Sequence, residues 1–135
     1  MSDKDLAFLA EKMRDIDIAM LMTHAEDGTI AGRPMSNNRD VEYDGDSYYF
    51  TTEDARMVKD IERDAKVALT FQGDRMFSIS LEGDAELIRD RSELAAHWTP
   101  DLDEWFKDTD GVVMIKVRAT RAHYWNGEEE GGVRL

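Results

Sequence analysis

The side chains best suited to chemistry in this sequence are anion-binding ones, and the first of them lies in residues 28–38. Arg33 stands there beside Pro34, and the side chains that share its strand face are small, apolar or neutral. Proline cannot donate to a sheet ladder, so the stretch is expected to form an edge strand or to lie beside a bulge. A guanidinium held on such a strand presents a planar fork to a phosphate or a carboxylate. The alternative is an exposed arginine whose stem covers its neighbours.

A second anion-binding group follows the aromatic stretch 47–51. Thr51 and Thr52 end that predicted strand, and Arg56 falls in the first turn of a helix predicted for residues 55–63. Free backbone N–H groups and the positive end of the helix dipole favour an anion at that point. The alternative is an ion pair of Arg56 with Glu53 or Asp60. If the two strands are neighbours, Arg33, Thr51, Thr52 and Arg56 converge on one phosphate-sized volume.

The composition limits the classes of function. The chain has 135 residues, 41% of them hydrophobic and 35% charged, which predicts a single domain over 1–135 with one core. The net charge of −13 argues against a nucleic-acid partner, although 11 of the 17 cations are arginines and a local basic pocket stays compatible with it. Cysteine is absent and the three histidines are scattered, so no metal site is expected. Neither a membrane span nor a signal peptide is visible, so we expect a cytoplasmic protein with no membrane partner.

The predicted elements that must position these groups alternate short strands with short helices. Strands are expected at 16–24, 28–38, 47–51, 66–71, 76–88 and 112–117, the last with an extension through 122–125 left open. Helices are expected at 2–14, where Ser2 and Asp5 resemble a capping box, and at 55–63, 90–98 and 101–106. Gly83 is suited to a bend or bulge, and residues 127–135 to a mobile tail or a capping loop. The pattern predicts an α+β fold in which a six-stranded antiparallel sheet forms a closed or nearly closed barrel with flanking short helices.

The order and spacing of several short motifs give the chain a resemblance to a known family. Arg-Pro-Met at 33–35, Tyr-Phe-Thr-Thr at 49–52, Ala-Arg-Met at 55–57 and Leu-Glu-Gly-Asp-Ala-Glu-Leu at 81–87 follow a hairpin in that order. The sequence resembles the FMN-binding split barrels of the pyridoxamine 5′-phosphate oxidase-like family, and among these the general stress protein 26 type. The likeness spans about residues 6–127.

The resemblance implies a homodimer with FMN at the subunit interface. Arg33 matches the arginine that meets the flavin phosphate, Pro34, Met35 and Ser36 match the run along the isoalloxazine edge, and Thr51 matches a threonine that contacts FMN. Arg56 keeps the cation of the phosphate-binding helix start, whereas Ala55 and Met57 replace the family's serine and lysine. Trp125 matches a tryptophan beside the flavin of the other subunit. The expected cofactor-binding residues are therefore Arg33, Pro34, Met35, Ser36, Thr51, Thr52, Arg56, Met57 and Trp125.

The resemblance also implies a flavin-dependent oxidoreductase of unidentified substrate, with no catalytic residue recognisable in the sequence. In the true oxidases an Arg-Leu-His-x-Arg segment after the tryptophan holds the substrate; here Arg134 and Leu135 follow without that histidine or second arginine, so pyridoxamine phosphate oxidation is not expected. The alternative function is a split barrel that has lost the flavin and serves as a non-catalytic ligand-binding or stress-related interaction module. Met57, in place of a cation, favours that alternative.

Overall fold

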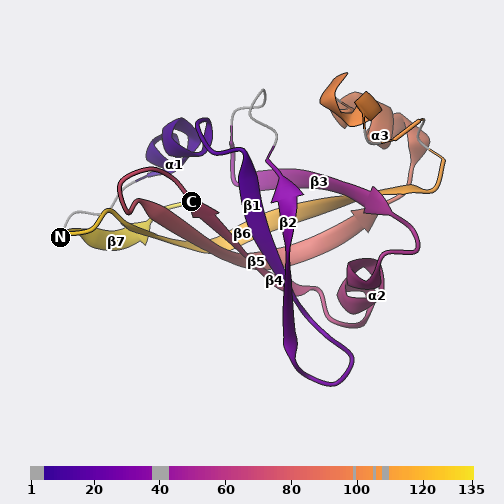
Figure 1. The fold of residues 1–135 in the computed structure, drawn as a ribbon, viewed down its shortest axis with the longest axis horizontal. Helices are drawn as coiled ribbons and strands as arrows, with labels where there is room; N and C mark the ends of the chain where they lie inside the picture. The colour runs from indigo at the N-terminus through magenta and orange to yellow at the C-terminus, as the bar shows by residue number, and fades with distance from the viewer. Residues whose placement is uncertain (1–4, 38–42, 99, 105, 108–109) are drawn as a thin grey trace.

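The fold is a single antiparallel sheet of seven strands with three short helices, in a computed structural model that describes residues 5–37, 43–98, 100–104, 106–107 and 110–135 (Figure 1). The strands are β1 (Ile18–His24), β2 (Ile30–Ser36), β3 (Asp46–Thr52), β4 (Lys66–Gln72), β5 (Ser78–Ile88), β6 (Val112–Trp125) and β7 (Glu130–Val133). The helices are α1 (Leu6–Met13), α2 (Arg56–Arg63) and α3 (Arg91–His97), followed by a 3₁₀ turn, η1 (Pro100–Glu104). The predicted α+β fold is confirmed.

The sheet runs in the order β2-β1-β4-β5-β6-β3, and β7 pairs with β6 beside this path. β6 is continuous from Val112 to Trp125, so the extension left open by the sequence is present. β7 is a seventh strand where the sequence suggested a tail or a capping loop. Its residues pair with the C-terminal end of β6, from Trp125 with Glu130 to Ala122 with Val133, so this end of the chain is held by a ladder.

A bulge lets the long β5–β6 ladder bend. Glu82 pairs with Arg121 but Gly83 pairs with Ala119, so β6 carries one extra residue at this point. A Cβ built on Gly83 would lie 2.1 Å from the carbonyl oxygen of Arg118, closer than any real contact. Glycine is therefore required by the close approach of the neighbouring backbone, as expected for a corner of a barrel.

The helices begin where local hydrogen bonds allow. α1 begins after Asp5, whose carboxylate accepts from the backbone N–H of Phe8; the predicted start at Ser2 lies outside the described residues. α3 is capped in the same way by Asp90. α2 begins after Ala55, whose methyl side chain cannot accept a hydrogen bond, so this helix has no side-chain cap. In the preceding turn the hydroxyl of Thr52 donates to Asp54 at 2.6 Å.

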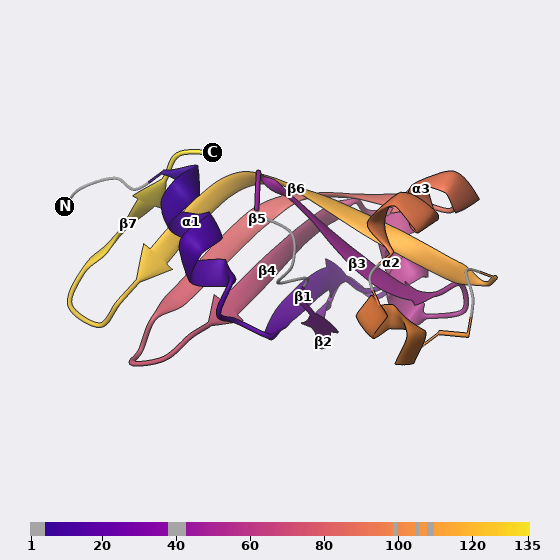
Figure 2. The same cartoon turned by 90° about the horizontal axis from the view of Figure 1, so that it is seen from above.

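The hydrophobic core lies inside the curled sheet, with a smaller cluster beneath α3. Residues Leu21, Leu69, Phe71 and Tyr124 are fully buried in the main core. Leu94 of α3 packs with Val112 and Met114 in the second cluster, so the first residues of β6 are buried on both faces. In both views α1 and β7 lie at one end of the molecule, and α2 and α3 lie at the other (Figures 1 and 2). None of the described helices is long and apolar enough to cross a membrane.

Candidate functional site

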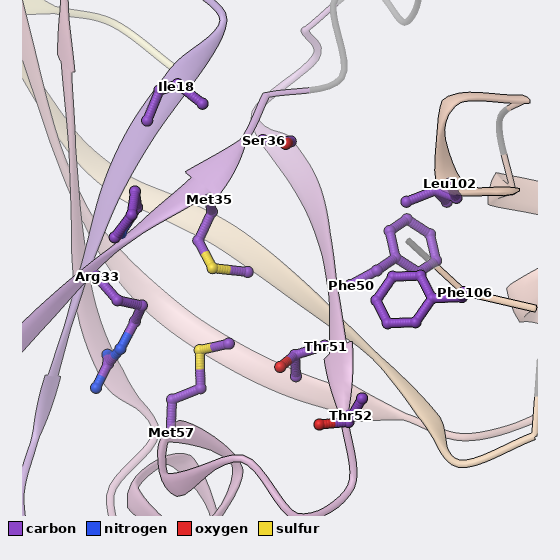
Figure 3. A pocket seen from close by; sticks show the side chains of 11 residues that line it. Ile18, Arg33, Met35, Ser36, Phe50, Thr51, Thr52, Met57, Leu102 and Phe106 are labelled. Atoms are coloured by element: carbon purple, nitrogen blue, oxygen red, sulfur yellow. The ribbon is translucent and has the colours of Figure 1, made fainter. Parts of the chain in front are cut away.

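A cavity of about 500 Å³ lies between the two end strands of the sheet, β2 and β3. In the described part of the chain these strands do not pair with each other, so the cavity occupies the split in the barrel. Ten side chains are labelled in Figure 3, and together with Pro34 they line it: Ile18, Arg33, Met35, Ser36, Phe50, Thr51, Thr52, Met57, Leu102 and Phe106. The cavity has the size of a small-molecule site, with mostly apolar walls and a few polar groups.

Most of the predicted site residues meet in this cavity. Arg33 to Ser36 come from β2, Thr51 and Thr52 come from the end of β3, and Met57 comes from the first turn of α2. In Figure 3 Met57 rises from α2 into the space between Arg33 and Thr51, with Met35 above it. Pro34 is opposite Met20 in the register of β1 and β2, on an end strand whose other side pairs with no described strand. The structure therefore places Pro34 on an edge, as its missing N–H requires.

Arg33 is held from behind by β1. Its Nη1 donates to the hydroxyl of Thr23 at 2.8 Å and to the carbonyl oxygen of Leu21 at 3.3 Å. Nε and Nη2 make no hydrogen bond to any described residue, and Nη2 lies 3.8 Å from a carboxylate oxygen of Asp60. Burial lowers the pKa of Arg33, the Asp60 charge opposes this and the Arg56 charge adds to it. One edge of the guanidinium is thus fixed by the fold while the other is left for a ligand.

The sequence did not predict the lining residues Ile18, Phe50, Leu102 and Phe106, nor the role of Asp60, which contacts Arg33 without lining the cavity. The Asp60 side chain is buried, at 2% exposure for the residue, whereas the sequence suggested only an exposed ion pair with Arg56. One carboxylate oxygen accepts from the hydroxyl of Thr23 at 3.0 Å, and the other accepts from Nη2 of Arg63 at 2.9 Å. The available signal was helical spacing: Asp60 stands three residues after Met57 and one before Ile61, on the apolar face of α2.

Two predicted residues stand outside the cavity. Arg56 is exposed at the first position of α2. Its positive charge lowers the pKa of Arg33, although burial lowers that pKa more. Trp125 is at the opposite end of β6 from Val113, the partner of Thr51, which is about 40 Å of extended strand. Trp125 therefore cannot reach the cavity of its own protomer along this strand.

The chain has two other tryptophans, Trp98 and Trp105. Trp98 packs edge-on against Phe50, with ring centroids 5.7 Å apart, and lies 6.0 Å from the ring of Phe106. Its indole N–H donates to Asp103 at 2.9 Å. Trp98 thus packs against Phe50 and Phe106, the two aromatic rings in the cavity wall, without lining the cavity itself. Trp105 lies outside the described residues.

The chemistry of the lining fits a flat heteroaromatic ring with an anionic tail. Phe50, Met35, Met57 and Phe106 provide apolar and polarisable surface for a ring. Nε and Nη2 of Arg33 and the hydroxyl of Thr51 provide donors for the charged end, whereas the hydroxyl of Thr52 already donates to Asp54. No group of acidic or histidine side chains in the described residues has an arrangement that would hold a metal ion.

Comparison with known proteins gives the same answer for the fold and the family. The family described as "Pyridoxamine 5′-phosphate oxidase like" matches residues 4–133. A solved structure of a protein related to general stress protein 26, from Clostridium acetobutylicum, is similar with a TM-score of 0.82 at 21% identity, covering 94% of this chain and 92% of that one. The general stress protein 26 of Bacillus anthracis gives a TM-score of 0.73 at 18% identity, covering 90% of this chain and 93% of that one.

A third similar structure is that of a heme binding protein from Mycobacterium smegmatis, with a TM-score of 0.70 at 18% identity, covering 91% of this chain and 56% of that one. Comparison with curated protein sequences finds no significant match. At these identities the solved structures show a shared fold, the split barrel, while the family match extends over nearly the whole chain. The chain therefore belongs to the pyridoxamine 5′-phosphate oxidase-like family.

Proposed function

We propose that this protein is a cytoplasmic, homodimeric flavoprotein that binds FMN in the cavity between β2 and β3 and serves as an oxidoreductase for an unidentified small molecule. One observation carries the proposal: the split of the barrel gathers Arg33 to Ser36 and Thr51 to Thr52 around a single cavity of about 500 Å³. FMN, when bound, supplies the redox chemistry, and the protein supplies its position and its electrostatic surroundings.

The residues of this chain divide between the two ends of such a ligand. Arg33 presents its free guanidinium edge to the phosphate, and the Arg56 charge at the start of α2 adds to the positive potential there. Thr51 offers a hydroxyl donor, and Thr52, whose hydroxyl donates to Asp54, lies beside it in the lining. Met35, Met57 and Phe50 contact the ring and exclude water from it, while the unpaired edge of β2 offers backbone groups around Ser36 to the polar atoms of the ring.

The proposed dimer is supported by an apolar outer face on the β1–β2 hairpin. Ile18, Met20 and Ile30 are 51%, 39% and 69% exposed, and alternation puts all three on the same side of the two strands. Large exposed apolar side chains gathered in this way are typical of an interface. A second copy packed on this hairpin also offers a source for Trp125, which is too distant within one protomer.

Heme is a poorer fit to this cavity than flavin. A protein normally holds heme iron through histidine, cysteine, tyrosine or a methionine paired with histidine. Among the described residues that line the cavity there is no histidine, cysteine or tyrosine. We therefore propose flavin as the ligand of this chain, and not the heme that one structural relative binds.

A second function is favoured by Met57, which is only 6% exposed and belongs to the main core. No cation stands at that position to bind a phosphate. A split barrel that does not retain flavin and serves as a non-catalytic binding or stress-related interaction module is consistent with such a site.

The absorbance spectrum of the purified protein and an FMN titration decide between these functions. We expect visible flavin absorbance in the native protein, lost on denaturation, or saturable quenching of flavin fluorescence when the apoprotein is titrated into FMN. A colourless protein that also leaves FMN fluorescence unchanged, at concentrations where the chain is folded, would contradict the flavin proposal and favour the interaction module.

A further inference from the structure

A buried carboxylate that does not line the cavity lies beside Arg33. Asp60 is 2% exposed, and its Oδ2 lies 3.8 Å from Nη2 of Arg33. Thr23 links the two groups, because its hydroxyl accepts from Arg33 at 2.8 Å and donates to Asp60 at 3.0 Å. Arg63 approaches Asp60 from the solvent side at 2.9 Å and also donates to the carbonyl oxygen of His24 at 3.2 Å. This arrangement surrounds Asp60 with three groups, Thr23 on β1, Arg33 on β2 and Arg63 on α2.

Asp60 is the negative group in a cluster whose other charged side chains, Arg33 and Arg63, are cations. Arg33 and Arg63 are both in contact with it, and the Arg56 charge also acts on Arg33. A buried charge is tolerated when it is paired and hydrogen-bonded, and removal of one partner leaves the other uncompensated. In the absence of a ligand, Asp60 supplies the negative charge that Arg33 needs.

We propose that Asp60 is an internal counter-ion for Arg33, which sets how strongly the cavity distinguishes a ligand with a phosphate from a neutral ligand with the same ring. The negative charge of Asp60 partly offsets the positive charge of Arg33, so Arg33 attracts a bound anion less strongly than it would without Asp60. Asp60 does not line the cavity, so it acts through Arg33 as a positioning and specificity residue. The inference rests on the proposed binding of flavin for its choice of ligands.

The test compares FMN with riboflavin, which lacks the phosphate, in the wild type and in Asp60→Asn. Asparagine keeps the size and an acceptor oxygen but removes the charge. We expect the ratio of riboflavin to FMN dissociation constants to rise about tenfold, the scale of a typical coupling between two sites. Glu62→Gln is the matched control, because it removes one negative charge from the exposed face of the same helix, where Glu62 lies 3.7 Å from Arg89. Its ratio should stay within about twofold of the wild type, as for a screened surface charge. An unchanged or lower ratio in Asp60→Asn overturns the inference.

Inorganic phosphate separates this inference from the flavin proposal. Thermal unfolding is followed with phosphate and with sodium chloride at the same ionic strength. Asp60→Asn should unfold at a lower temperature than the wild type in chloride, and phosphate should stabilise it more than it stabilises the wild type or Glu62→Gln. If neither flavin binds but this difference is found, the flavin proposal fails and the counter-ion role stands. If flavin binds and phosphate stabilises all three proteins equally, the counter-ion role fails alone.

Arg63→Gln is used if Asp60→Asn does not fold. Loss of Arg63 leaves the Asp60 charge to act on Arg33 alone, so the preference for FMN over riboflavin, or the stabilisation by phosphate, should fall. Lys59→Gln removes one cation from the exposed side of α2 and serves as its control. A fall in Arg63→Gln that exceeds the fall in Lys59→Gln supports the counter-ion role, and equal effects overturn it.

Discussion

Arg33 on β2 and Thr51 on β3 line the same cavity, although their strands are the two opposite ends of the sheet. The two residues are connected through five strand pairings, from β2 by way of β1, β4, β5 and β6 to β3. A ligand that contacts both would bridge the split and tie the ends of the sheet together. Ligand binding is therefore expected to stabilise the whole fold, by an amount that grows with the logarithm of the ligand concentration relative to its Kd.

The first prediction concerns Arg33 and the phosphate. Arg33→Ala should weaken FMN by about 1.5–3 kcal/mol, roughly tenfold or more, because a charge-assisted hydrogen bond is lost. Riboflavin should be affected much less. Arg33→Lys should restore only part of the FMN affinity, because an ammonium cannot present the planar fork. Paired fluorescence titrations of both ligands measure this.

The same substitution tests the buried cluster, because Arg33 also pairs with Asp60. Arg33→Ala should lower the free energy of unfolding of the apoprotein by about 1–3 kcal/mol, the cost of a buried group left with fewer partners. Equal losses of affinity for FMN and riboflavin would place Arg33 at the ring or in the scaffold and would contradict the phosphate role.

The second prediction concerns Met57, which rises between Arg33 and Thr51 (Figure 3). Met57→Lys should strengthen FMN binding about tenfold or more, since a cation there adds a charged contact of about 1.5–3 kcal/mol beside the start of α2. The apoprotein should become less stable, because Met57 is a core residue and the new ammonium faces Arg33. Met57→Leu is the control, with flavin titration and urea unfolding as the measurements. No gain of Met57→Lys over Met57→Leu would mean that the ammonium does not reach the ligand.

The third prediction is a dimer in solution formed through the β1–β2 hairpin. Sedimentation at micromolar concentration should show twice the chain mass of 15.5 kDa. Ile30→Asp should shift the protein toward monomer and weaken FMN, because it puts a charge on the exposed apolar face. Ala7→Asp adds the same charge at an exposed site in the first turn of α1 and should change neither. A monomeric wild type would contradict both the dimer and a flavin site shared between subunits.

The fourth prediction is a pH dependence from Tyr49. The residue is 1% exposed, and its hydroxyl lies near that of Ser47 without a hydrogen bond of normal geometry to any described residue. Burial raises the pKa of Tyr49 above its ordinary value of 10.0, and the nearby Ser47 hydroxyl opposes part of this rise. The fold therefore keeps Tyr49 protonated, and its contribution to stability is complete below the unfolded-state pKa and is lost as the pH rises above it. This loss should approach about 1.4 kcal/mol per pH unit.

Tyr49→Phe should remove that alkaline loss and leave stability at neutral pH unchanged or higher, since no bond is broken. Tyr43→Phe is a matched control, because burial also raises the pKa of Tyr43 but its hydroxyl donates to the carbonyl oxygen of Gly45 at 3.2 Å. That variant should lose about 1 kcal/mol at neutral pH. Urea unfolding at neutral and strongly alkaline pH measures both; an unchanged alkaline slope in Tyr49→Phe would contradict the assignment.

Local patterns in the sequence determined the elements and most of the candidate site. The alternation around Arg33, the suitability of Pro34 for an edge strand and the threonines that end β3 all follow from residues close in the chain. Such short-range preferences act before any tertiary contact forms. For this reason the fold class and the positions of Arg33, Thr51 and Met57 on their elements could be predicted. The sequence also predicts a bend or bulge at Gly83, but the strict need for glycine there comes from the backbone of Arg118 on the neighbouring strand.

Only the tertiary structure decided which groups face one another. The approach of β2 to β3 depends on the curl of the whole sheet. The pairing of Glu130–Val133 with β6 could not be predicted, because an acidic, glycine-rich stretch lacks the residue pattern of a strand. Asp60 is buried because Thr23, 37 residues earlier, and Arg33 supply its partners. A carboxylate on a helix is ordinarily solvated, and only partners brought from distant strands make its burial favourable.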